Sequence, residues 1–259
     1  MSNNYSHISI YFNHIYDIIT LEVINMTAKT KQGISIIVVY IAVWIAVLIL
    51  QIVMSIPYIN TEGVIVMTEA QEYRFISITN IILYSTISLI FVIMLRSYLK
   101  EQYIYTKNNF HDFMKITILG LSGLFLSLLF ASSIMELLGV TENSNNQEVL
   151  NNLLNSELFD KVSLIVFSVF FAPFVEEIVF RRAVFGFFEK TSIPLAIIAS
   201  GISFGFVHVL TGDYVQLIIY GSLGLVLAYT YYRSNKNIIT VITIHMIYNL
   251  IITIIMLAF

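Results

Sequence analysis

The chain has 259 residues, of which 58% are hydrophobic and 11% are charged, with a mean hydropathy of +0.85 and a formal net charge of −3. Soluble domains carry about 25% charged residues, so the composition indicates a membrane protein, and the small net charge argues against a nucleic-acid partner. Because the sequence has no cysteine, disulfides, thiol nucleophiles and cysteine-type zinc sites are excluded.

The N-terminal segment, residues 1–33, is expected in the cytoplasm or at the membrane interface. It lacks a compact apolar core and carries Asp17 and Glu22, so we expect no cleavable signal peptide. Residues 8–24 have apolar side chains at helical spacing, which fits an interfacial helix and a loosely ordered tail equally well.

Long apolar runs then predict an all-α, polytopic transmembrane bundle of about seven to eight membrane helices. The expected spans are 34–56, 76–95, 115–139, 161–187, 193–210, 214–232 and 238–258. They divide into accessory helices in 34–140, a polar loop in 141–160 and a C-terminal core in 161–259, which holds most of the unusual polar residues.

The basic residues predict the orientation. With the N-terminus inside, 11 of the 13 Lys and Arg residues fall in inner segments, and the outer segments hold only Arg74 and Lys161. This distribution follows the positive-inside rule and places the loop at 141–160 outside. The chain is therefore expected to be a multi-pass protein of the cell membrane with its N-terminus in the cytoplasm.

The fourth span contains charged residues that require an explanation, in the stretch FAPFVEEIVFRRAVF. Glu177 and Arg181 are four residues apart and so share a helical face, where each offsets the desolvation of the other. Glu176 lies about 100° around the helix, which predicts that it points into a polar cavity. Pro173, three residues earlier, can kink the helix or start a new one.

Two intramembrane histidines follow. His208 comes four residues after Phe204, and His245 comes four residues before Asn249, so each pair shares a helical face. One buried histidine is often only a packing residue, but glutamate, two histidines and an amide together can activate water and bind an oxyanion. Glu136, near the outer end of the third span, has no such companions and is interpreted as interfacial.

Other features are interpreted structurally. Gly201, Gly205, Gly221 and Gly224 favour close helix packing, and the tyrosines of 229–233 are typical of an aromatic belt at the membrane surface.

In order and spacing, EEIVFR, FGFVH and HMIYN resemble the family of CAAX proteases and bacteriocin-processing enzymes, also called the CPBP or Abi family. The family pattern is EExxxR, FxxxH and HxxxN, and the resemblance covers roughly residues 160–255. No HExxH or GxGD sequence is present.

The resemblance implies an intramembrane endopeptidase whose core is 161–259. By analogy, Glu176 and His208 activate the attacking water, while His245 and Asn249 stabilise the oxyanion. The implied supporting residues are Glu177, Arg181 and Phe204. The expected substrate is a peptide precursor or a membrane protein. The alternative is a non-proteolytic immunity or scaffold protein; a small transporter is less well supported, because the halves show no inverted repeat.

The family pattern leaves the metal question open. Glu176, His208 and His245 could ligate zinc with a position left for water. We nevertheless favour a site without a cofactor, because Asn249 suits an oxyanion better than zinc. A zinc-bound histidine usually donates its other ring N–H to a carboxylate or carbonyl, and the one other carboxylate, Glu177, is expected to pair with Arg181.

The depth of the site is also left open by counting residues. At about 1.5 Å per residue, Glu176 and His245 fall in the inner half of the membrane, whereas His208 falls nearer the outer side.

Overall fold

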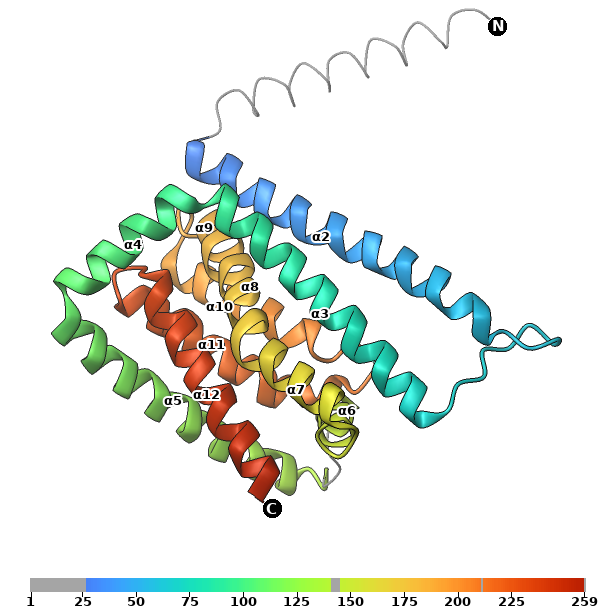
Figure 1. The fold of residues 1–259 in the computed structure, drawn as a ribbon. Coiled ribbons are helices and arrows are strands. Elements are labelled where there is room, and N and C mark those ends of the chain that lie inside the picture. Colours follow the sequence, from blue (N-terminus) through green and yellow to red (C-terminus); the bar gives the residue numbers. More distant parts are fainter. Residues whose placement is uncertain (1–26, 141–144, 211, 259) are drawn as a thin grey trace, which may run out of the picture.

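A computed structural model describes residues 27–140, 145–210 and 212–258 (Figure 1). Within these ranges the chain is helical, and β-structure is limited to one isolated bridge between Ile59 and Ile65. The interfacial helix considered for residues 8–24 lies outside the described residues.

The elements are, in chain order, α2 Ala28–Ser55, η1 Ile56–Tyr58, α3 Glu69–Met94, α4 Arg96–Asn108, α5 Phe110–Leu137, α6 Asn145–Leu154, α7 Leu158–Val166, η2 Phe167–Phe171, α8 Ala172–Glu177, η3 Ile178–Phe185, α9 Gly186–Phe188, α10 Ile193–Val207, η4 Tyr214–Gln216, α11 Leu217–Arg233 and α12 Ile238–Ala258. The segments η2 and η3 are π-helical, and together with α7, α8 and α9 they form one continuous helix.

The all-α polytopic bundle is confirmed, but the expected count of seven to eight membrane helices was too high. Six helices in the described part of the chain are long and apolar enough to cross a membrane. The expected span at 193–210 is the exception, because α10 ends at Val207 after 15 residues. A helix of that length reaches about 22 Å, short of the roughly 30 Å hydrocarbon core.

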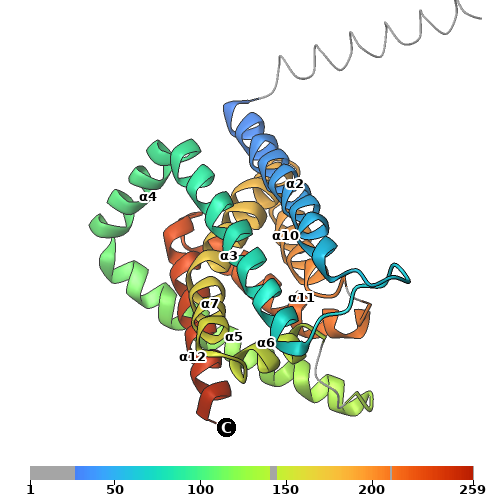
Figure 2. The same ribbon diagram turned by 45° about the vertical axis from the view of Figure 1, so that its right-hand side comes forward.

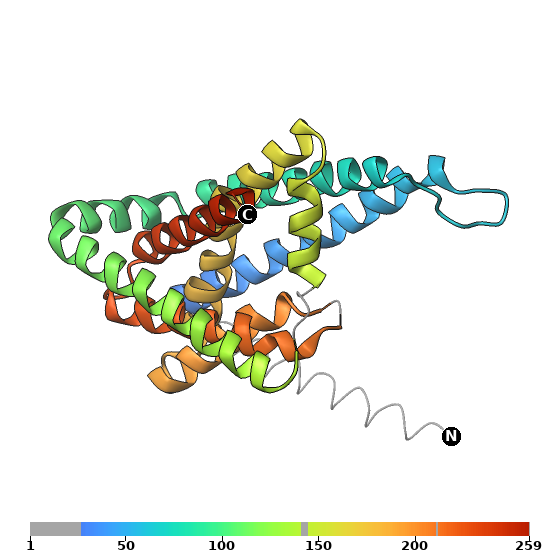
Figure 3. The same cartoon turned by 90° about the horizontal axis from the view of Figure 1, so that it is seen from below.

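The bundle has two distinct ends, which we name by the short helix at each (Figure 1). The α4 end holds the start of α2 and the whole of α4. The α6 end holds α6 and the C-terminal ends of α5 and α12. Figure 2 shows α2 standing in front of α10 and α11, and Figure 3 shows α6 lying across its end of the bundle. The helix from Leu158 to Phe188 runs between the two ends.

Close approach of α10 and α11 depends on glycine. A Cβ on Gly205 would lie 2.4 Å from the backbone nitrogen of Gly221, and a Cβ on Gly224 would lie 2.3 Å from the carbonyl oxygen of Gly201. The two helices therefore touch backbone to backbone, which agrees with the packing role expected for these glycines.

Ion pairs tie the α4 end together. Glu189, which follows α9, pairs with Lys29 of α2 and, at 2.6 Å, with Lys236 before α12. Burial by itself would raise the pKa of Glu189, but the hydrogen bonds and positive charges of Lys236 and Lys29 outweigh it and lower that pKa. Three segments distant in the sequence are thus joined at one carboxylate.

Tyr231 corrects the expectation of an aromatic belt. Tyr229 and Tyr232 are exposed, as a belt requires, but Tyr231 is buried and packs edge-on against Phe185 with 5.2 Å between ring centroids. Helical periodicity turns this middle tyrosine toward the core.

The polar segment 141–160, expected as a loop, contains α6. Leu153 and Leu154 on this helix are buried with Leu164 of α7. Beside it, Arg74 of α3 binds Asp160 at 2.9 Å. The segment is therefore packed on the bundle, because a few leucines among its asparagines give α6 one apolar face.

Candidate active site

A cavity of about 1230 Å³ opens within the bundle and is lined by Glu176, His208, His245 and Asn249. All four residues to which the resemblance gives a catalytic role thus line one space. Its wall also includes residues of α2, α3 and α5. The helices expected to be accessory therefore help to shape the site.

The backbone of the central helix changes register around Pro173. In η2 the N–H of Ala172 donates to the carbonyl of Phe167, five residues back, instead of four. The same register would assign the carbonyl of Ser168 to the N–H of residue 173, but proline has none. The Asn249 side-chain amide donates to this carbonyl at 2.8 Å. Pro173 thus neither breaks the helix nor starts a new one, and the carbonyl that it leaves free fixes Asn249.

Glu177 and Arg181 form a fully buried ion pair. Arg181 Nε donates to Glu177 Oε2 at 2.8 Å, and both side chains have 0% exposure. Arg181 Nη1 also donates to the Ser200 carbonyl at 3.1 Å, which joins the central helix to α10. The guanidinium carbon lies 5.3 Å from the centre of the Phe204 ring, so part of its charge faces an aromatic surface.

His245 lies between the two adjacent glutamates. Its Nδ1 is 3.0 Å from Glu177 Oε1, and its Nε2 is 3.9 Å from Glu176 Oε2. Since a carboxylate accepts, Nδ1 carries a proton and Nε2 faces the cavity. The distance from Nε2 to Glu176 is too long for a direct hydrogen bond but can be bridged by one water.

His208 is held by the residues around it. Its Nδ1 lies 2.8 Å from the carbonyl oxygen of Phe204, so this nitrogen is the donor and Nε2 is left as the acceptor. Its ring stacks on Tyr220 of α11, with centroids 4.8 Å apart at 18°, and contacts the Phe204 ring at 4.8 Å.

These contacts answer the question of depth. His208 follows the last residue of α10, but its side chain turns back by one turn to reach Phe204, as side chains on a helix lean toward its N-terminus. The Phe204 ring also lies 5.6 Å from the His245 ring. A short helix and a backward-pointing side chain therefore bring His208 level with the other site residues.

The pattern gave no signal for three of the four tyrosines of the cavity. Tyr40 of α2, Tyr84 of α3, Tyr220 and Tyr248 all line it. Tyr248 stands within HMIYN, three residues after His245. No fixed spacing links the other three to the glutamates or histidines, so only the packing of the bundle shows that they belong to the site.

The candidate zinc ligands named above are Glu176, His208 and His245. In the described part of the chain, no three His, Asp or Glu side chains are grouped closely enough to hold an ion. One reason given above against zinc was nevertheless wrong. Glu177 binds Arg181 through Oε2 only, and its other oxygen, Oε1, contacts His245 Nδ1.

Comparisons with known proteins match the same part of the chain. Residues 158–251 match the family described as type II CAAX prenyl endopeptidase Rce1-like. This segment is similar to an Rce1-like domain. It includes every residue of the EExxxR, FxxxH and HxxxN pattern.

One curated relative is similar over nearly the same length. It is the Bacillus subtilis (strain 168) protein named "Putative membrane peptidase YdiL", 34% identical over 96 residues. The alignment covers 37% of this chain and 36% of that protein, so it spans little more than a third of either. No solved structure matches the chain. Helices α2 to α5 lie outside the matched residues 158–251, so the comparisons do not describe them.

Proposed function

We propose that this protein is an intramembrane endopeptidase that hydrolyses a peptide bond in a peptide precursor or a membrane protein. The observation that carries the proposal is that Glu176, His208, His245 and Asn249 line one cavity between membrane helices. The membrane character of the chain and the Rce1-like match of residues 158–251 support it.

In the proposed reaction, a water molecule lies between Glu176 and His245. Glu176 takes its proton while the oxygen attacks the carbonyl carbon of the substrate, and His208 Nε2 can accept or share that proton. The electron pair of the C=O bond moves to oxygen and forms a tetrahedral oxyanion. The proton then passes to the leaving nitrogen, the C–N bond breaks, and the products are a carboxylic acid and an amine.

His245 and Asn249 are the proposed donors to the oxyanion. One hydrogen of the Asn249 amide is on the Ser168 carbonyl, and the other remains for the substrate. His245 can donate from Nε2 when it is protonated on both nitrogens, a form that Glu177 stabilises through Nδ1. The Glu177–Arg181 pair thereby orients a proposed catalytic group while it braces the fold.

The test is cleavage of a co-expressed peptide library in membranes, with wild-type protein and with Glu176→Gln. The substitution keeps the shape of the side chain and removes the base, so turnover should fall by about 10²–10⁴-fold. Glu148→Gln, on the exposed face of α6, is the matched control and should cleave normally. Undiminished cleavage by well-folded Glu176→Gln would refute the proposal.

The reaction is proposed to need no metal. Purified enzyme should then retain its turnover after prolonged treatment with a strong chelator. Activity that is lost on chelation and restored by Zn²⁺ alone would contradict this part of the proposal and make His208 and His245 ligands.

A further inference from the structure

The cavity extends from the site toward the α6 end of the bundle and sideways to Ile41 and Trp44 of α2, but not toward the α4 end. On α12 its lining runs from His245 to Met256, and on the central helix from Glu176 back to Leu164. Both runs go from the middle of the bundle to its α6 end. Glu176 and His245 therefore lie at the closed end of the cavity.

The opposite direction is filled by packed side chains. Arg181 and Ser200 are fully buried immediately behind the site. Farther toward the α4 end, Phe185, Tyr231 and Ile238 are at most 1% exposed. A peptide can thus reach Glu176 from the α6 end but not from the α4 end.

The lining carries little charge. Of the Asp, Glu, Lys and Arg side chains, only Glu176 and Glu136 are among the described lining residues. Glu136 lies in the last turn of α5, at the α6 end, and is exposed. The remaining wall is mainly aromatic and aliphatic, including Trp44, Leu128 and Phe167.

We propose that Glu136 is a specificity residue, which binds a basic side chain of a mainly apolar peptide that enters from the α6 end. This inference rests on the proposed function, because it assigns the substrate of the same site. A carboxylate at the mouth of an apolar cavity favours a cation at one position and disfavours an acidic residue there.

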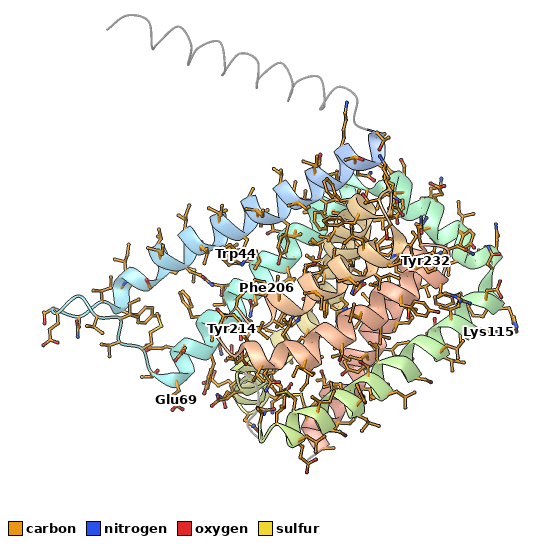
Figure 4. All side chains as sticks on the ribbon, turned by 180° about the vertical axis from the view of Figure 1, so that it is seen from behind. Trp44, Glu69, Lys115, Phe206, Tyr214 and Tyr232 are labelled. Atoms are coloured by element: carbon orange, nitrogen blue, oxygen red, sulfur yellow. The ribbon has the colours of Figure 1, made fainter. Side chains whose placement is uncertain are left out.

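The surroundings support a basic partner. Glu69 and Glu72 in the first turn of α3 and Glu148 on α6 are exposed at the same end, where Figure 4 labels Glu69. The basic residues at this end are Arg74 and Lys161, and Arg74 is paired with Asp160 at 2.9 Å and with Glu157 at 2.8 Å. Among the described residues, carboxylates therefore outnumber cations at the α6 end, and they attract basic peptides over distances of about one Debye length.

Helix geometry gives the position of the basic residue. Phe125 of α5 is level with Tyr248, since their ring centroids are 5.3 Å apart, and Tyr248 adjoins Asn249. Glu136 comes 11 residues later on the same helix, about 16 Å farther along the axis. An extended peptide advances roughly 3.3 Å per residue, so the basic residue should be about five positions from the cleaved bond.

The test uses quenched fluorescent peptides with one apolar sequence and Lys, Gln or Glu at each position up to about eight from the cleaved bond. Wild-type protein should prefer Lys at about the fifth position, with a kcat/KM about tenfold above that of the Gln peptide. Glu136→Gln should abolish this preference, mainly through KM, and Glu136→Lys should reverse it toward the Glu peptide. Glu148→Gln, which removes a charge at the same end but outside the lining, should keep the preference.

Binding to the Glu176→Gln variant separates this inference from the proposed function. Fluorescence anisotropy should show about tenfold tighter binding of the Lys peptide than of the Gln peptide, and the difference should vanish when Glu136→Gln is added. If this binding difference is present but wild-type protein cleaves nothing, the proposed function fails and the role of Glu136 stands. Equal binding of the Lys, Gln and Glu peptides, with or without Glu136, would overturn the inference.

Access from the α6 end can be tested in the same assay, because the chain has no cysteine. A bulky maleimide on Ser132→Cys, in the lining near Glu136, should block peptide binding. The same label on Lys100→Cys, exposed on α4, should leave binding unchanged. The opposite pattern would place the entrance at the α4 end and refute the proposed route.

Discussion

The two ends of the bundle use their polar residues in opposite ways. At the α4 end, Glu189 is bound by two lysines from distant segments, and the space between the helices is filled. At the α6 end, a cavity separates the helices, and Glu136 lines it without an ion pair among the described residues. The closed end can hold the site residues in place, while the open end leaves room for a substrate.

The two ends of the bundle should face opposite sides of the membrane. This can be tested by labelling, with an all-or-none difference expected between the two ends. Single cysteines at Asn108, beside the α4 end, and at Asn155, beside the α6 end, are both exposed. An impermeant thiol reagent on intact cells should label only the cysteine at 155, because the basic residues predict that the α4 end is cytoplasmic. Labelling of the cysteine at 108 instead would invert the orientation.

Arg181→Ala should have the largest effect on stability. It leaves Glu177 charged and buried without its partner, which costs about 3–5 kcal/mol in comparable buried pairs. Accumulation of folded protein, measured by fluorescence-detected gel filtration, should fall at least as much as turnover per cell. Arg233→Ala, at an exposed position, is the control. Normal accumulation with abolished turnover would instead give Arg181 a direct role in the reaction.

Gly205→Ala should have the next largest effect. The new methyl would meet the Gly221 backbone at 2.4 Å, so α10 and α11 must separate. Overpacking of this kind costs about 1–3 kcal/mol and should lower the melting temperature in detergent. Gly221→Ala is a matched control in the same pair of helices, since its nearest contacts are at 3.6 Å. Equal melting temperatures for the two variants would contradict the backbone-to-backbone contact.

Glu189→Gln should have the smallest effect, about 1 kcal/mol or less, because its lysine partners are partly exposed. The pKa of Glu189 is lowered in the folded protein, so its contribution is complete above the ordinary value of 4.5 and is lost as the pH falls through the lowered value. The difference in melting temperature between wild type and variant should therefore be largest at neutral pH and shrink in acid. A difference that grows in acid would contradict the ion pairs at this end.

Much of the fold could be predicted because it depends on local composition. Five of the seven expected spans correspond to longer helices whose ends differ from them by at most seven residues, and the span at 238–258 agrees at both ends. The expected span at 193–210 is too long, because apolar residues continue past Val207 although the helix does not. Hydropathy measures only the transfer of side chains to lipid, whereas the end of a helix depends on backbone hydrogen bonds and on caps such as His208.

The sequence alone identifies the candidate residues for the chemistry, since Glu176, His208, His245 and Asn249 are unusual in apolar spans and stand at helical spacing from other motif residues. How they are connected follows only from the folded bundle. Glu177 contacts both Arg181 and His245, and Asn249 binds a carbonyl that Pro173 leaves free. It also decided that Tyr40, Tyr84, Tyr220 and Glu136 share the cavity. Spacing along one helix fixes which side chains share a face, but contacts between helices depend on their packing, which no single segment encodes.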